Sequence, residues 1–241
     1  MKTKKLFRQP FLVFGMIFLV TTILLVGTLV YQVINFTTDT SKSVQNQVTE
    51  EQQDNYTLRE DATEYQRTLF NELEEAKEAY DLMKDDETTL EYAEAIVKNF
   101  IADFYTWSNK SGRSDVGGVQ FIAKPNQATF KKQAIDGFYV NLDYYLNKYE
   151  GNDLQTVKEV EILDQDLNYQ ITLEKEVEVD GVTEVEEEYI DAISIHASWS
   201  YNHSTFDEVD LFQNEAVFIL TSSDNKLVIS EILEPLDTTI E

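Results

Sequence analysis

The sequence predicts a mixed α+β protein with one membrane-spanning segment near its N-terminus. Three observations carry this prediction. Residues 11–34 form a run of 24 residues without a charged side chain. Apolar residues then recur every three or four positions from 58 to 149, as in amphipathic helices, and every second position from 160 to 232, as in half-buried strands. Helices that all precede a set of long strands indicate helices packed on an antiparallel sheet.

The apolar run 11–34 is expected to be an uncleaved signal anchor. At about 1.5 Å per residue, a helix of this length reaches about 36 Å, more than a hydrocarbon core of about 30 Å requires. A cleaved signal peptide needs a shorter apolar region and a small-residue cleavage site, and neither is present. Four basic residues and no acidic residue precede the run, so we expect residues 1–10 in the cytoplasm and the C-terminal domain outside the cell membrane.

The composition narrows the class of the expected exported domain. The chain has 45 acidic and 19 basic residues, for a formal net charge of −26. A surface of this charge repels phosphate groups, which argues against nucleic-acid binding. The chain has no cysteine, which excludes a disulfide framework, a thiol nucleophile and a cysteine-ligated zinc site.

Two segments precede the expected globular domain. Residues 35–57 are polar and without apolar periodicity, which predicts a linker. From 58 to 87 a narrow apolar stripe predicts a long helix, with two interpretations left open. The helix is either a self-associating stalk or a helix that packs on the folded domain. In the first interpretation the seam of a homo-oligomer comprises Leu58, Tyr65, Leu69, Leu73 and Met83.

The folded domain is expected to span residues 88–241. Thr88 and Glu91 have the spacing of a capping box, which predicts that a second helix, with a wide apolar face, begins there. A third helix is expected from about 128 to 149, and Gly137 inside it indicates a bend or a close approach.

A glycine pair lies between these two helices. Gly117 and Gly118 indicate a turn, but no Lys-Ser or Lys-Thr follows them as a phosphate-binding loop requires.

Alternating apolar residues predict a meander of antiparallel strands in the second half of the domain. Asp180-Gly181 and Asp224-Asn225 each lie between two alternating runs, and such pairs are typical of two-residue hairpin turns. No helical pattern returns between the runs, which argues against a parallel sheet.

The first of these hairpins is strongly acidic. It is most simply a solvated hairpin whose charges repel one another, and the alternative is a docking surface for a basic partner. The candidate docking residues are Glu174, Glu176, Glu178, Asp180, Glu184, Glu186, Glu187 and Glu188.

A calcium loop is suggested by the spacing of three oxygen-bearing side chains and then excluded. Asp164, Asp166 and Asn168 match the first positions of such a loop. Tyr169 and Lys175 stand where the invariant glycine and the bidentate glutamate are required. No metal site is therefore predicted, and no cofactor.

The two histidines do not form a recognisable catalytic constellation. His196 shares a strand face with Ser194 and Ser198, but neighbours on one face do not supply a nucleophile, a base and an orienting acid. His203 lies in a polar turn. No catalytic residue is predicted, and we expect the protein not to be an enzyme.

The order of these parts resembles that of VirB8-like proteins of conjugation and type IV secretion channels, of the Gram-positive type. The resemblance rests on the basic tail, the single span, the aromatic-rich helix 92–107 and the helix 130–149 before the strands. It implies an NTF2-like fold and a membrane-anchored scaffold that oligomerises and contacts other envelope or channel proteins. Enzymes also occur in this fold, with a His and Asp pair in a cone-shaped pocket between sheet and helices.

The acidic hairpin departs from what the resemblance implies. It keeps a second function open, a membrane-anchored extracellular binding or sensing protein that docks a basic partner through the hairpin.

Overall fold

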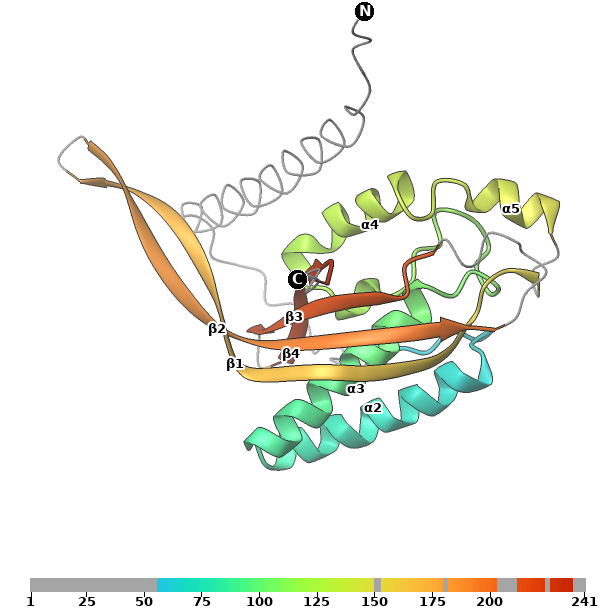
Figure 1. Cartoon of the computed structure of the whole chain (residues 1–241), viewed down its shortest axis with the longest axis horizontal. Helices are drawn as coiled ribbons and strands as arrows, with labels where there is room; N and C mark the ends of the chain where they lie inside the picture. The colour runs from blue at the N-terminus through green and yellow to red at the C-terminus, as the bar shows by residue number, and fades with distance from the viewer. Residues whose placement is uncertain (1–55, 150–152, 180–181, 203–211, 224–225, 236–241) are drawn as a thin grey trace, which may run out of the picture. The chain divides into compact units, whose positions relative to one another are not determined.

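The computed structural model describes residues 56–149, 153–179, 182–202, 212–223 and 226–235. In chain order the helices are α2 (Glu64–Leu82), α3 (Asp86–Phe104), α4 (Gln127–Asp136) and α5 (Leu142–Lys148), with 3₁₀ turns at Val119–Phe121 and Lys124–Asn126. The strands follow as β1 (Val157–Val179), β2 (Val182–Tyr201), β3 (Glu215–Ser223) and β4 (Lys226–Leu233). They form one sheet in the order β1-β2-β3-β4 (Figure 1). The predicted α+β class is confirmed.

The predicted anchor at 11–34 and most of the predicted linker lie outside the described residues. Among the residues that the structure does describe, no helix combines the length and apolar character needed to cross a membrane. The chain divides into two compact units. Of the described residues, 56–172 and 189–235 belong to the unit here called the body, and those between 173 and 188 belong to the other unit.

Helices α2 and α3 form an antiparallel pair at the start of the body. Thr63 caps α2 in a reciprocal capping box with Gln66. Asp85 caps α3 in the same way with Thr88, so the predicted box from Thr88 to Glu91 is wrong by one turn. Thr88 fits the pattern at both places, but Asp85 precedes it by three residues and begins the helix earlier.

The predicted helix from 128 to 149 is two helices. Gly137 ends α4, where its N–H donates to the carbonyl of Gln133 at 2.8 Å. The chain turns through residues 138–141 before α5 begins at Leu142. Glycine is a poor helix former, which favours a helix end at this position. The apolar residues on either side of Gly137 nevertheless keep a helical spacing in the sequence.

Both predicted hairpin positions are confirmed by the strand boundaries. β1 ends at Val179 and β2 begins at Val182, and β3 ends at Ser223 and β4 begins at Lys226. β2 pairs with β3 and β3 with β4 in antiparallel registers, which include Ile195 opposite Phe218.

β1 forms one edge of the sheet, beside α2. The N–H of Val160 on β1 donates to the hydroxyl of Tyr65 on α2 at 2.9 Å. The edge strand is therefore tied to the helix next to it.

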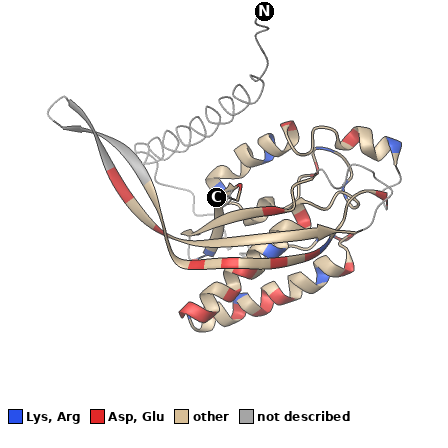
Figure 2. Cartoon of the chain, in the orientation of Figure 1, with Lys and Arg blue, Asp and Glu red and all other residues tan. Residues whose placement is uncertain are grey.

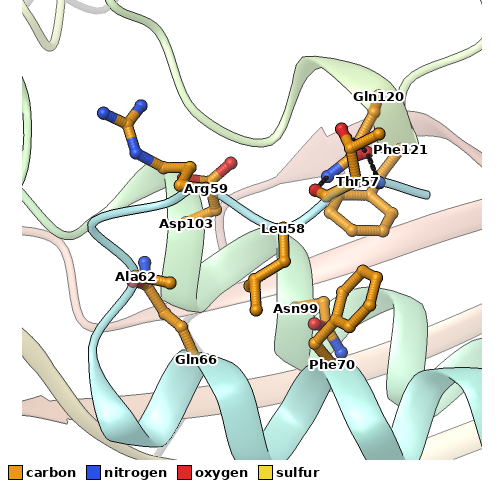
Figure 3. Close-up of a pocket in the computed structure, with 10 residues that line it drawn as sticks. All are labelled: Thr57, Leu58, Arg59, Ala62, Gln66, Phe70, Asn99, Asp103, Gln120 and Phe121. Carbon is orange, nitrogen blue, oxygen red and sulfur yellow. Dashed lines mark hydrogen bonds between the residues drawn. The ribbon is translucent and has the colours of Figure 1, made fainter.

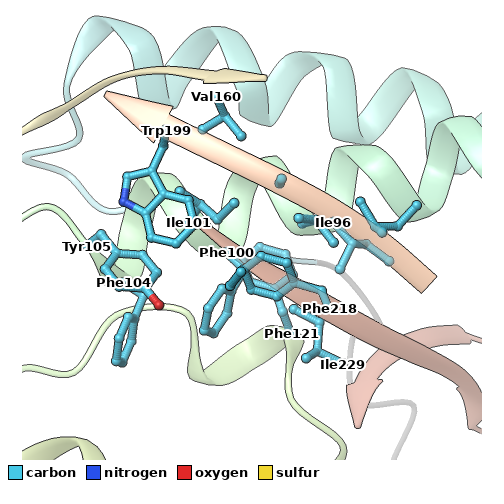
Figure 4. Packing of buried hydrophobic residues seen from close by; sticks show 14 of the residues in the cluster. Ile96, Phe100, Ile101, Phe104, Tyr105, Phe121, Val160, Trp199, Phe218 and Ile229 are labelled. Carbon is cyan, nitrogen blue, oxygen red and sulfur yellow. The ribbon is translucent and has the colours of Figure 1, made fainter. Parts of the chain in front are cut away.

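The core lies between α3 and the sheet (Figure 4). Ile96, Phe100 and Ile101 of α3 are fully buried, as are Phe218 and Ile229 of the sheet. The rings of Phe100 and Phe218 meet edge to face, with their centroids 5.7 Å apart. Burial of this apolar face is what fixes α3 on the sheet.

Candidate functional site

The space between the helices and the sheet is filled by aromatic side chains. The centroids of the Tyr105 and Trp199 rings are 4.3 Å apart, and those of Phe104 and Phe138 are 5.2 Å apart. The hydroxyl of Tyr139, which is fully buried, donates to the carbonyl of Phe104 at 2.5 Å. Burial raises the pKa of Tyr139 far above its usual value, so this phenol stays neutral. The rings of these residues pack closely on one another.

A small cleft lies under residues 56–62, here called the proximal segment because it is the first part of the chain that the structure describes. Leu58 and Arg59 cover it, and α2, α3 and the 3₁₀ turn at Val119–Phe121 line it (Figure 3). Its volume of about 20 Å³ holds about one water molecule. The cleft is therefore too small for an organic ligand.

Arg59 is the centre of a charge network beside this cleft. Its guanidinium group donates to both carboxylate oxygens of Asp115, at 2.6 and 3.0 Å, and to the carbonyl of Asn109 at 2.8 Å. It also donates to Asp61 at 3.0 Å. Asp115 accepts two further bonds, from the backbone N–H and the hydroxyl of Ser111. This bidentate geometry is the strong form of an Arg–carboxylate pair.

The pKa values of this pair follow from its surroundings. Burial alone would raise the pKa of the Asp115 carboxyl, but the hydrogen bonds from Arg59 and Ser111 outweigh burial and hold the pKa well below its usual range. The hydrogen bond to Asp115 raises the pKa of Arg59 above its already high value. Both groups are therefore charged at neutral pH.

A second ion pair lies deeper in the body. The Lys110 ammonium donates to Asp103 on α3 at 2.7 Å, and the Lys110 side chain is fully buried. Burial lowers the pKa of Lys110, and Asp103 opposes this shift. The other oxygen of Asp103 accepts the N–H of Gly118 at 2.7 Å. Asp103 thus connects α3 to the loop that carries Lys110 and Gly118.

The paired glycines allow this loop to touch α3. A Cβ atom on Gly117 would lie 2.3 Å from the carbonyl oxygen of Asp103. Gly118 has φ +73°, and a Cβ atom there would lie 2.7 Å from the Phe100 ring. The predicted turn at this pair is a close approach of two backbones.

The proximal segment is held at its other end by neutral hydrogen bonds. The hydroxyls of Tyr56 and Tyr92 are 2.8 Å apart. Thr57 donates its N–H to the side-chain oxygen of Gln120 at 2.8 Å and accepts the amide of the same side chain at 3.0 Å. The segment is thus fixed along its length to α3 and to the loop after it.

This arrangement is a clamp that joins the proximal segment to α3 and to the loop after it. The carboxylates of Asp61, Asp103 and Asp115 each accept a hydrogen bond from a basic side chain, either Arg59 or Lys110. Within the described ranges, no group of three or more His, Asp or Glu side chains could hold a metal ion. We call the proximal segment and the partners of Arg59 the proximal clamp.

The predicted oligomer seam is corrected by the packing of α2. Leu69 is 4% exposed and Leu73 is fully buried within the body, where α2 packs on α3. The hydroxyl of Tyr65 binds β1, and Leu58 lies over the cleft. The alternative interpretation, a helix that packs on the folded domain, fits this placement, and only Met83 at the end of the stripe is widely exposed.

Two buried amides join α2 to α3 and were not identified from the sequence. The Gln66 amide donates to the carbonyl of Ala102, and the Asn99 amide donates to the carbonyl of Leu69, each at 2.8 Å. Polar residues inside an apolar stripe are a signal for such bonds, because buried amides need partners.

The candidate docking residues lie where the hairpin was expected. Glu174, Glu176 and Glu178 belong to β1, and Glu184, Glu186, Glu187 and Glu188 belong to β2. Glu187 and Glu188 are exposed, and Asp180 lies outside the described residues.

His196 pairs with an acidic side chain on the neighbouring strand. Its Nε2 is 2.7 Å from a carboxylate oxygen of Glu215. The pair is partly exposed. His203 lies outside the described residues. Asp166 accepts the N–H of Asn168, so it serves the local backbone.

The fold and the site define a class, an α+β domain with a filled interior and a clamped N-terminal segment. Comparisons with protein-family models, with curated proteins and with solved structures found no match to this chain.

Proposed function

We propose that the chain is a membrane-anchored scaffold subunit of a conjugative or type IV secretion-like channel, with an NTF2-like domain outside the cell membrane. The observation that carries the proposal is the filled interior. Where an enzyme of this fold would have an open pocket, the rings of Tyr105, Phe138 and Trp199 pack on one another. Close packing of these described rings favours action through the surface, and a scaffold is a protein of that kind.

The proximal clamp gives this proposal a mechanical basis. A scaffold that positions other subunits needs a fixed relation between its domain and the chain that leads to it. Arg59 and Tyr56 fix the proximal segment to the loop at Asp115 and to Tyr92 on α3. Residues 56–62 are therefore fixed to the body, which places the end of the predicted linker, at residues 56–57, at one defined point on it.

Membrane topology is the first test. The chain has no cysteine, so single cysteines can be introduced cleanly. A cysteine replacing Thr40 should react with an impermeant maleimide on intact protoplasts, whereas one replacing Thr3 should react only after lysis. Reversed labelling would place the domain in the cytoplasm and end the proposal.

The second test is functional. Deletion of the gene in its own host should reduce conjugative transfer or secretion by orders of magnitude, and the full chain should restore it. A variant that lacks residues 1–36 should fail to restore it, because it would lose the anchor. Normal transfer in the deletion strain would contradict the channel role.

A further inference from the structure

Charge is distributed unevenly over the body. Residues 60–91 contain twelve acidic and three basic residues, whereas residues 113–148 contain three acidic and five basic residues. Figure 2 shows mostly acidic residues along α2 and β1, and basic residues beside acidic ones on α4 and α5. Residues 113–148 thus carry an excess of positive charge in a chain of net charge −26.

The turn between α2 and α3 is an apolar tip with an acidic rim. Leu82 is 81% exposed and Met83 is 61% exposed. The rim is formed by the exposed side chains of Asp81, Asp85, Asp86 and Glu87, beside one Lys84 that lies over the Tyr80 ring. We call this surface the acidic end.

The segment around α5 has the opposite character. Val140 is 45% exposed and Tyr144 is 61% exposed. The Lys148 ammonium lies 5.8 Å from the centre of the Tyr144 ring. Arg113 adjoins α5, where its backbone N–H donates to the Asp143 carboxylate at 2.9 Å. Both basic side chains are exposed, as is the carboxylate of Asp143, so basic residues outnumber acidic ones here by one. We call Arg113, Val140, Tyr144 and Lys148 the basic end.

The two ends match as partners but cannot meet within one chain. Each end has exposed apolar side chains at its centre and charged side chains around them, as protein interfaces commonly do. The net charges of the two rims have opposite sign, so the two surfaces are complementary. Figure 1 shows the turn after α2 and helix α5 at opposite ends of the body. A second copy of the chain offers each end a surface of complementary charge.

We propose that the acidic end of one copy docks on the basic end of the next. Such a contact is heterologous, so it produces a closed ring or an open row of copies, not a two-fold dimer. The proposal deepens the proposed function, because it names the surface through which the scaffold assembles. It also replaces the predicted seam, whose residues Leu69 and Leu73 are buried inside the body.

Disulfide crosslinking tests the contact in membranes that contain the full chain. The variant with both Met83→Cys and Tyr144→Cys should form a ladder of dimers, trimers and larger species on mild oxidation. Each single variant should stay monomeric, because in a head-to-tail contact the introduced cysteine of one chain never faces the same cysteine of the neighbouring chain. Crosslinked dimers from either single variant would overturn the head-to-tail arrangement.

Charge reversal tests the complementarity. Asp86→Lys with Glu87→Lys, or Arg113→Glu with Lys148→Glu, should each reduce the ladder at least tenfold. The matched controls are Glu74→Lys with Glu75→Lys on the exposed side of α2, and Lys124→Glu with Lys158→Glu, which should leave the ladder intact. A ladder that survives reversal at both ends would contradict the proposal.

Co-expression provides a rescue that misfolding cannot imitate. One chain carries Met83→Cys with the reversed acidic end, and the other carries Tyr144→Cys with the reversed basic end. Together they should give a crosslinked heterodimer, because the reversed rims are again complementary. Neither chain should crosslink to the unreversed single-cysteine chain that carries the opposite cysteine.

The outcomes separate the interface from the proposed function. A normal ladder with normal transfer in the deletion strain would support the interface and contradict the channel role. Loss of transfer on deletion, without any ladder, would support the channel role and overturn the interface.

Discussion

The guanidinium group of Arg59 donates hydrogen bonds to both oxygens of the Asp115 carboxylate, at 2.6 and 3.0 Å. The two residues are 56 positions apart in sequence, and both side chains are about three-quarters buried. The pair fixes the first described residues of the chain to the loop that follows α3.

Replacement of Arg59 should therefore weaken the body. Arg59→Leu leaves Asp115 without its bidentate donor in a partly buried site, which should lower the free energy of unfolding by about 1.5–3 kcal/mol. The measurement is urea unfolding of the purified chain. The matched control is Arg113→Leu, whose ion pair with Asp143 is long, at 3.9 Å, and half exposed. That variant should stay within about 0.5 kcal/mol of wild type, and equal losses in both variants would refute the argument.

The same pair predicts a dependence on pH in the acid range. The pKa of Asp115 is lower in the folded protein than its ordinary value of 3.8. The folded state therefore binds fewer protons than the unfolded state between the two pKa values. The stabilisation is fully present above pH 3.8 and is lost as the pH falls through the folded-state pKa.

Asp115→Asn makes this prediction measurable. The difference in unfolding free energy between wild type and Asp115→Asn should be largest near neutral pH and should shrink below about pH 4. A difference that stays constant over this range would show that the carboxylate charge at Asp115 does not stabilise the fold.

Gly117→Ala should be strongly destabilising. The added Cβ would lie 2.3 Å from a backbone oxygen of Asp103, which cannot move without shifting α3. At Gly112 the nearest atom is a side-chain oxygen of Asp143, at 2.9 Å, on an exposed residue that can rotate away. We expect a large drop in melting temperature for Gly117→Ala and a small one for Gly112→Ala. Similar melting temperatures would show that the loop does not need its close approach.

Two substitutions of Trp107 separate its packing from its polarity. Trp107→Ala removes a fully buried ring and should cost about 3–5 kcal/mol. Trp107→Phe keeps much of the ring and removes an Nε1 atom that is buried without a hydrogen-bond partner among the described residues. It should cost less than about 1.5 kcal/mol. Chemical denaturation measures both, and equal costs would contradict a packing role.

Removal of the acidic hairpin should leave the body folded. Residues 173–188 belong to a compact unit separate from the body. Replacement of 174–187 by Asn-Gly keeps residues 173 and 188 on either side of a two-residue turn. The urea midpoint of the body should be unchanged, and the crosslinked ladder should persist.

The same deletion distinguishes the second function left open by the sequence. A protein that docks a basic partner through the hairpin would lose its function with the hairpin, although its body and its oligomers remained intact. Retained transfer would favour the scaffold.

The sheet could be predicted because its signals are local. Apolar alternation predicted the strands. The pairs Asp180-Gly181 and Asp224-Asn225 predicted where one strand ends and the next begins. The helix break at Gly137 was missed in part, because Phe130, Ala134 and Phe138 keep a helical spacing across it. Periodicity reports which face is buried and does not report whether the backbone is continuous.

The proximal clamp could not be predicted, because nothing local connects its members. Arg59 and Asp115 are ordinary charged residues in polar segments, and their pairing depends on how α3 places the loop after it. The narrow stripe on α2 was misleading for a different reason. Leu69 and Leu73 are buried where α2 packs on α3, and packing on a neighbouring helix buries as narrow a strip as a coiled-coil seam does.

The hydrogen bond from Val160 to Tyr65 also has a consequence for copies that are crowded together. An edge strand offers unpaired backbone groups to any other strand, which is the usual route to aggregation. Tyr65 occupies one such group near the start of β1, and the exposed carboxylates of Glu159, Glu161 and Asp164 repel the same edge of another copy. Neighbouring copies are thereby kept from joining their sheets, even at the high local concentrations that confinement to one membrane would produce.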